Sequence, residues 1–193
     1  MIRFVLVLCL ALSSCSASSG DGWTVTVYYT AVASFHDGAT ERVTGCPRLE
    51  CSSGTDDLGT YPSSFVRAVR DEGTGRIDAG RYLNWSVDVG FWLDSAPRDS
   101  AGGVLEPWRS AAADADVLGA GKQFTIASCG PADDVAAEVC DRLREARWII
   151  RDEFTPGLGG DRHVDVYIGE ETGPAFTESE WYTTLENARL TFS

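Results

Sequence analysis

Two carboxylates lie at the ends of apolar segments in the stretch 148–169. Asp152 closes one apolar run, and Asp165 lies between Val164 and Val166 in the next. Apolar surroundings or a neighbouring carboxylate raise the pKa of a carboxyl group, so that it can hold a proton near neutral pH. These acids are therefore candidates for general acid–base chemistry, and Asp165 is the stronger of the two.

Strands on either side of a glycine-rich loop must position these acids. The runs 148–150 and 164–168 are rich in β-branched and aromatic residues, and the loop between them contains Pro156, Gly157, Gly159 and Gly160. We predict further strands over 23–30, 82–93, 122–127 and 188–192. We also predict a short helix over 65–70 and a longer helix over 133–147. A turn is expected at 76–80, and loop excursions are expected over 42–61 and 94–108. The pattern indicates a mainly β barrel with one clear amphipathic helix, whose buried stripe is Val135, Val139 and Leu143.

The composition limits the possible partners. The chain has 193 residues and a formal net charge of -13, and it shows no basic patch. Nucleic acid is therefore not an expected partner, because binding to phosphates depends on lysine and arginine. The length suits one sizeable core, so we expect a single, monomeric domain over 23–193.

The N-terminus has the features of an export signal. Arg3 precedes an apolar run over 4–12 that is too short to span a bilayer, and we assign 1–14 to a signal peptide. The segment ending at Cys15 resembles a bacterial lipobox, which predicts lipidation of Cys15 and a flexible tether over 15–22. Ordinary cleavage near Ala17 is the alternative, and it would give a secreted protein.

Four cysteines remain outside the signal and the lipobox. Their even number in an exported chain indicates two disulfides, most simply Cys46–Cys51 and Cys129–Cys140. Three pairings are possible from sequence alone. A zinc site is the rival interpretation, but no histidine lies close in sequence to either pair, so we expect no metal.

Three segments resemble a known family. The segment 112–121, the segment 152–169 and the pair Trp181-Tyr182 occur in the order and approximate spacing of the three-aspartate domain. That domain is also the barrel core of the membrane-bound lytic transglycosylase A family, MltA, whose tyrosine-rich start is similar to residues 28–32. The resemblance is best over 109–192 and weak over 35–107. It implies a six-stranded double-psi β-barrel.

The family's three aspartates correspond to Asp114, Asp152 and Asp165. Of these, Asp165 matches the position of the catalytic acid in the lytic enzymes. The loop after Asp152 lacks the lysine that is usual in the family and is two residues longer, and Gly119 replaces a proline. For each aspartate the structural alternative is a side chain that bonds backbone amides or caps a turn.

The resemblance implies a peptidoglycan lytic transglycosylase in the bacterial cell envelope. Such an enzyme cleaves the β-1,4 bond between N-acetylmuramic acid and N-acetylglucosamine with one carboxyl group as acid and then base, and forms a 1,6-anhydro ring without metal or cofactor. Sugar-stacking surfaces are predicted at Trp148, Tyr167, Trp181 and Tyr182. The alternatives are a barrel that binds cell-wall glycan or inhibits a partner protein without cleavage, and a hydrolase that uses water.

Three other charged or titratable residues have simpler interpretations. His163 could orient a group in the groove, but we expect a rim residue that points away from Val164. Glu170 and Glu171 are expected to be exposed.

Overall fold

The computed structural model describes residues 18–51, 53–131 and 135–193, and its centre is a closed, mixed six-stranded barrel. The strands lie in the order β10-β7-β9-β8-β11-β1, and pairing of β1 with β10 closes the barrel. Their bounds are β1 (Ser18–Val32), β7 (Ser110–Ala112), β8 (Gln123–Ser128), β9 (Trp148–Asp152), β10 (His163–Glu170) and β11 (Leu185–Phe192). The β1–β10 and β7–β9 pairs are parallel, and the others are antiparallel. The expected mainly β, six-stranded barrel is confirmed.

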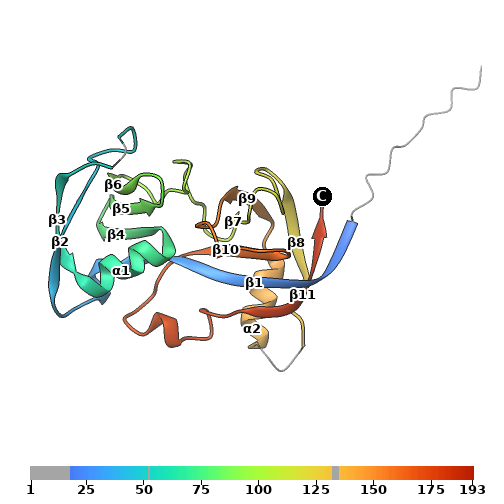
Figure 1. Ribbon diagram of the computed structural model, residues 1–193. Helices are drawn as coiled ribbons and strands as arrows, with labels where there is room; N and C mark the ends of the chain where they lie inside the picture. Colours follow the sequence, from blue (N-terminus) through green and yellow to red (C-terminus); the bar gives the residue numbers. More distant parts are fainter. Residues whose placement is uncertain (1–17, 52, 132–134) are drawn as a thin grey trace, which may run out of the picture.

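A second lobe occupies the chain between β1 and β7 (Figure 1). It contains β4 (Thr74–Asp78), β5 (Arg81–Ser86), β6 (Gly90–Asp94), the hairpin β2 (Thr40–Gly45) and β3 (Asp56–Pro62), helix α1 (Ser63–Glu72) and the 3-10 turn η1 (Ala33–Phe35). The strands β4, β5 and β6 continue the sheet from the far end of β1, where Ala31 pairs with Gly75. The predictions of a loop over 42–61 and a turn at 76–80 were therefore wrong. Both regions gain strand pairing from partners that local sequence does not reveal.

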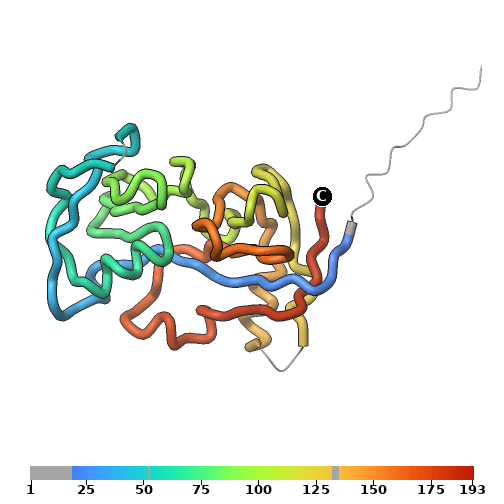
Figure 2. Tube along the Cα trace, viewed as in Figure 1, coloured from blue at the N-terminus to red at the C-terminus, as the bar shows by residue number. Residues whose placement is uncertain are grey.

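The long strand β1 connects the two lobes. Figure 2 shows its blue trace between the orange trace of β10 and the red trace of β11. Its side chains alternate, so that Val25 and Val27 enter the barrel core while Thr26 and Tyr28 face the opposite side. The strand begins at Ser18, which pairs with Phe192, so residues 18–22 are not the expected tether. The predicted signal peptide and the lipidation site Cys15 lie outside the described residues.

Two disulfides, one in each lobe, and a second helix complete the structure. Both predicted pairs, Cys46–Cys51 and Cys129–Cys140, are confirmed, which removes the zinc alternative for these cysteines. Cys129–Cys140 joins the end of β8 to α2 (Ala137–Glu145). This helix is shorter than predicted, and Val139 and Leu143 are its buried residues. The short helix predicted over 65–70 is confirmed as α1 and extends a few residues further at both ends. The second 3-10 turn, η2 (Phe176–Glu178), lies between β10 and β11.

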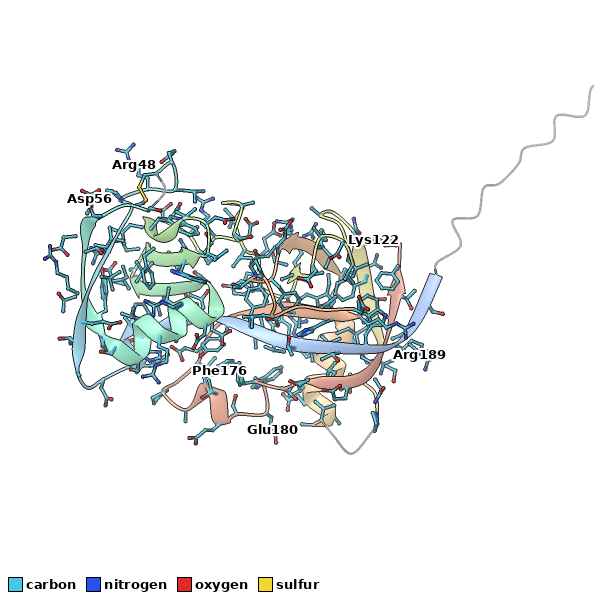
Figure 3. The ribbon with its side chains drawn as sticks, viewed as in Figure 1. Arg48, Asp56, Lys122, Phe176, Glu180 and Arg189 are labelled. Carbon is cyan, nitrogen blue, oxygen red and sulfur yellow. A yellow bond between two sulfur atoms is a disulfide. The ribbon has the colours of Figure 1, made fainter. Side chains whose placement is uncertain are left out.

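Figure 3 marks the two ends of the molecule. Arg48 and Asp56 lie at the outer end of the second lobe beside a disulfide, whereas Lys122 and Arg189 lie on the barrel.

Disulfides are typical of proteins exported to an oxidising compartment. No helix among the described residues is long and apolar enough to cross a membrane. Within the same residues, no group of three or more His, Cys, Asp or Glu side chains is arranged to hold a metal ion.

Candidate active site in the cleft between the lobes

A cleft of about 420 Å³ lies where the barrel meets the second lobe. The barrel contributes β1, the end of β9 with the following loop, and β10. The second lobe contributes the C-terminal end of α1, the end of β5 with Trp85, and the turn between β5 and β6. The cleft also includes Tyr182, from the segment before β11. Its walls therefore come from segments that are widely separated in the chain.

Asp165 lies in this cleft at the centre of three paired strands. It pairs with Thr26 of β1 on one side and with Ala112 of β7 on the other. The alternation of a strand sends the neighbours Val164 and Val166 into the barrel core, where both are fully buried. Asp165 must then point to the opposite face, into the cleft. The apolar neighbours that made it a candidate in the sequence thus serve to anchor its strand.

The surroundings of Asp165 favour its protonated form. Burial raises the pKa of Asp165 to about 7, and the charge of Asp152 acts in the same direction. Hydrogen bonds from the Thr26 side chain and the Val166 backbone oppose these effects. The Oδ1 atom is buried and has no hydrogen-bond partner among the described residues. Asp165 can therefore exchange a proton near neutral pH, as a general acid must.

Asp152 also lines the cleft, but it is held by several hydrogen bonds. Its Oδ1 accepts hydrogen bonds from the backbone N–H of Ser100 at 2.9 Å, from the Ser100 hydroxyl at 2.7 Å and from the Glu153 N–H at 2.9 Å. Burial raises the pKa of Asp152, and these hydrogen bonds oppose the rise. Asp152 therefore holds the loop that contains Ser100 against the barrel, and its charge raises the pKa of Asp165.

Asp114, the third predicted aspartate, is not among the residues that line the cleft. Its carboxylate lies against the backbone of Gly159, where a Cβ atom would collide with both carboxylate oxygens. The glycine-rich loop is thereby seated on Asp114. The carbonyl oxygen of Asp114 also accepts hydrogen bonds from Val117 and Leu118, as in a turn. The position of Asp114 supports a structural role, so the structure brings two of the three aspartates together in the cleft.

Only one of the four predicted sugar-stacking residues reaches the cleft. Trp148 is 0% exposed and donates a hydrogen bond from Nε1 to the carbonyl of Leu143. Tyr167 is 1% exposed and shares a hydrogen bond with Thr30 at 2.6 Å. Both predictions were wrong: Trp148 lies in the barrel core, and Tyr167 lies on the Asp165 face of β10 but is buried in a separate cluster with Tyr28 and Leu105. Trp181 packs edge-on against Trp108 and does not line the cleft.

Tyr182 is the exception, since it lines the cleft and is 41% exposed. Two further apolar side chains, Val87 and Leu158, line the same cleft and are also exposed. Val87 belongs to the second lobe and Leu158 to the glycine-rich loop. Apolar side chains on both walls suit a ligand that has apolar as well as polar faces.

The side chain of Thr26 connects His163 to Asp165. The His163 Nε2 atom shares a hydrogen bond of 2.9 Å with the Thr26 hydroxyl, and the His163 ring packs on Phe154 with the centroids 4.6 Å apart. His163 points away from buried Val164, as predicted, and it lines the cleft. Thr26 lies between the histidine and the acid. In a nucleophilic triad the histidine would lie between the other two, so this arrangement is not one.

Two acids at the end of β10 hold the second lobe against the barrel. Glu170 forms an ion pair with Arg76 of β4 at 2.9 Å. Glu171 is only 6% exposed and accepts hydrogen bonds from the Val32 N–H and from His36 Nε2 at 2.8 Å. The expectation that Glu171 is exposed was therefore wrong. These contacts fix how the two walls of the cleft face each other.

Sequence reasoning missed Glu72, which lines the cleft from the second lobe. It is the last residue of α1 and follows Arg70 and Asp71, so its local sequence is that of an exposed helix end. No local signal distinguishes Glu72 from its charged neighbours. Only the contact between the lobes places Glu72 near Asp165, whose charge raises the pKa of Glu72.

The fold is similar to that of known lytic transglycosylases. A crystal structure of MltA from Escherichia coli with bound chitohexaose matches with a TM-score of 0.60 and 16% identity, over 91% of this chain and 74% of that chain. A membrane-bound lytic murein transglycosylase from Agrobacterium tumefaciens matches with a TM-score of 0.58 and 12% identity, over 91% and 75% of the two chains. No family model matches the sequence, and no curated protein matches it significantly.

At these identities the similarity shows a common fold and does not identify catalytic residues. It covers 91% of the chain, so it includes the second lobe as well as the barrel. The sequence resemblance was weak over 35–107, where the structural similarity continues.

Proposed function

We propose that this protein is a peptidoglycan lytic transglycosylase with Asp165 as its general acid and base. The observation that carries the proposal is the position of Asp165, which points into the cleft between the two lobes from a strand whose neighbouring valines are buried, with a pKa raised to about 7. The similar E. coli and A. tumefaciens enzymes support the choice of reaction. The proposed substrate bond is the β-1,4 bond between N-acetylmuramic acid and N-acetylglucosamine.

The reaction needs one proton donor and no water. Asp165 donates its proton to the glycosidic oxygen, and the bond between this oxygen and the anomeric carbon breaks. The Asp165 carboxylate then removes the proton from the 6-hydroxyl of the same muramic acid. The resulting oxygen attacks the anomeric carbon and closes the 1,6-anhydro ring. Asp165 is protonated again at the end, so the step balances without a second carboxylate.

The second lobe gives the cleft its other wall. Trp85 and Val87 face the cleft from this lobe, and Tyr182 and Leu158 face it from the rest of the chain. In the proposed complex these side chains contact the apolar faces of the sugar rings. Tyr182 replaces Trp148 and Tyr167 as the expected stacking residue, since the latter two are buried.

The proposed location is the bacterial cell envelope. Lipid at Cys15 would attach the protein to the membrane, and the two disulfides support an oxidising compartment. The N-terminal strand β1 starts at Ser18, so only a short segment separates the proposed anchor from the barrel.

The product distinguishes this reaction from hydrolysis. Incubation of purified peptidoglycan with the protein should release muropeptides that end in 1,6-anhydro-N-acetylmuramic acid. Mass spectrometry detects them because each is lighter by one water than the hydrolytic product. Release of reducing-end products would indicate a hydrolase. Binding to peptidoglycan without any release would instead support the non-catalytic alternative.

The pH dependence should follow the protonation of Asp165. The acid must carry its proton at the start of the reaction, so the rate should fall as pH rises through about 7. Replacing Asp152 with Asn removes a charge that raises the pKa of Asp165, so the decline should move to lower pH in this variant. The measurement is the initial rate of muropeptide release from about pH 4 to about pH 9, an interval that contains the pKa values of both ordinary and raised carboxyl groups. A decline at the same pH in both proteins would contradict the coupling.

A further inference from the structure

Glu72 is a carboxyl group in the cleft that the proposed reaction does not use. It ends α1, and Gly73 follows in a left-handed conformation with φ 83°, which turns the chain toward β4. Its Oε2 accepts a hydrogen bond from the backbone N–H of Tyr29, and its Oε1 accepts one from the Tyr182 hydroxyl, both at 3.3 Å. Contacts from β1 and from the segment before β11 thus hold this second-lobe side chain in place.

These contacts make Glu72 a defined part of the cleft wall. Burying a carboxylate is costly, so a buried carboxyl group tends to stay neutral. Burial, with a smaller effect from the charge of Asp165, raises the pKa of Glu72 to about 8. The same group at an exposed helix end would be ionised at neutral pH. Glu72 therefore differs from Asp71, which precedes it and is exposed.

A neutral carboxyl group has a donor that a carboxylate lacks. In both contacts Glu72 is the acceptor, from the Tyr29 N–H and the Tyr182 hydroxyl, so neither uses the O–H group of a neutral Glu72, which stays available as a donor to a ligand. A glycan offers many acceptor oxygens in its hydroxyl and acetamido groups. We propose that Glu72 is a further substrate-binding residue, which donates a hydrogen bond from its neutral carboxyl group to an acceptor oxygen of the glycan. This inference rests on the proposed function, since it takes the glycan as the ligand.

The neighbours of Glu72 allow a clear pH test. The groups that act on it are Asp165 of β10, Tyr29 of β1, Tyr182, and Asp71 of its own helix. The pKa of Tyr29 is raised by burial, and burial raises that of Tyr182 to about 12, so neither ionises between pH 5 and pH 9. Asp165 is removed by the Asp165→Asn substitution. In that background Glu72 and Asp152 are the cleft carboxyl groups whose pKa burial raises, and comparison with the Glu72→Gln variant isolates the contribution of Glu72.

The test is calorimetric binding of chitohexaose to Asp165→Asn and to double variants that also carry Glu72→Gln or Glu72→Ala. At pH 5 to 6 the Gln variant should bind like Asp165→Asn, because its amide can still donate. The Ala variant should bind about tenfold more weakly, as expected for one hydrogen bond. Toward pH 9, Asp165→Asn should lose about the same factor as Glu72 ionises, whereas the Gln variant should not.

Several results would overturn the inference. They are equal affinity of the Ala and Gln variants for chitohexaose, a Gln variant that loses as much affinity toward high pH as Asp165→Asn does, or no binding of chitohexaose to Asp165→Asn. Thermal unfolding of each variant shows whether it is folded. The binding readout is independent of cleavage, so the expected pattern in a protein that releases no muropeptide would support Glu72 and contradict the lytic reaction. Normal cleavage with no effect of Glu72→Ala on binding would do the reverse.

Discussion

Replacing Asp165 with Asn should reduce muropeptide release by about 10²–10⁴-fold, the range expected for loss of a general acid. The Asn side chain has nearly the same shape and keeps the contact with Thr26, but it cannot donate a proton to a glycosidic oxygen. It also cannot remove one from the 6-hydroxyl in the second half of the reaction. The measurement is the initial rate of anhydro-muropeptide release from purified peptidoglycan at about pH 5 to 6, below the raised pKa of Asp165, where the parent carboxyl group carries its proton.

Asp114→Asn is the matched control for this experiment. It makes the same chemical change at an aspartate that is not among the residues lining the cleft, and it retains a polar group beside Gly159. Its rate should stay within a few-fold of the parent. Binding of chitohexaose should survive in Asp165→Asn, which would show that the loss lies in the chemical step. If Asp165→Asn cleaved at the parent rate, Asp165 would not be the acid.

Replacing Trp148 with Ala should destabilise the protein by roughly 3–5 kcal/mol, as is typical when a large buried aromatic side chain is removed. Trp148 is fully buried on β9, and its Nε1 donates to the carbonyl of Leu143 on α2 at 3.2 Å. The substitution would therefore leave a cavity and remove a hydrogen bond between the strand and the helix. Urea unfolding with the disulfides intact measures the change in the free energy of unfolding.

Tyr182→Ala is the control, because this side chain is 41% exposed in the cleft. Its effect on the free energy of unfolding should stay below about 1 kcal/mol, whereas its affinity for chitohexaose should fall. The two substitutions thus separate an aromatic residue of the core from one of the cleft. A stable Trp148→Ala protein that binds glycan poorly would support Trp148 as a sugar-stacking residue, the prediction that its burial contradicts.

Short-range patterns predicted much of the barrel. The alternation of apolar and polar residues identified most of β1 and β10, and glycine and proline marked the loop between β9 and β10. The spacing of Val139 and Leu143 identified α2. Each of these signals is a repeat within one element, which is set by the periodicity of a strand or helix. The very short strand β7 was missed, because three residues carry too little pattern and gain their pairing from β9 and β10.

Two of the failed predictions concerned which side chains other segments of the chain cover. Trp148 and Tyr167 were expected at a sugar-binding surface, and Glu171 was expected in solvent. Aromatic residues suit both cores and binding surfaces, and a glutamate is usually exposed. The choice depends on what packs against the residue. For Glu171 that is the Val32 N–H and His36, which lie far away in the chain.

The sequence by itself identified Asp165 as a candidate acid and the strand that presents it. Asp165, between two valines that must enter a core, is directed to the opposite face by strand geometry alone. Only the tertiary structure decided which groups surround that acid. It brought Asp152 beside Asp165, placed Asp114 beneath the glycine-rich loop, and added Glu72 from the second lobe. The physical reason is that pairing and packing between distant segments depend on the whole fold, whereas the direction of a side chain along a strand depends only on its neighbours.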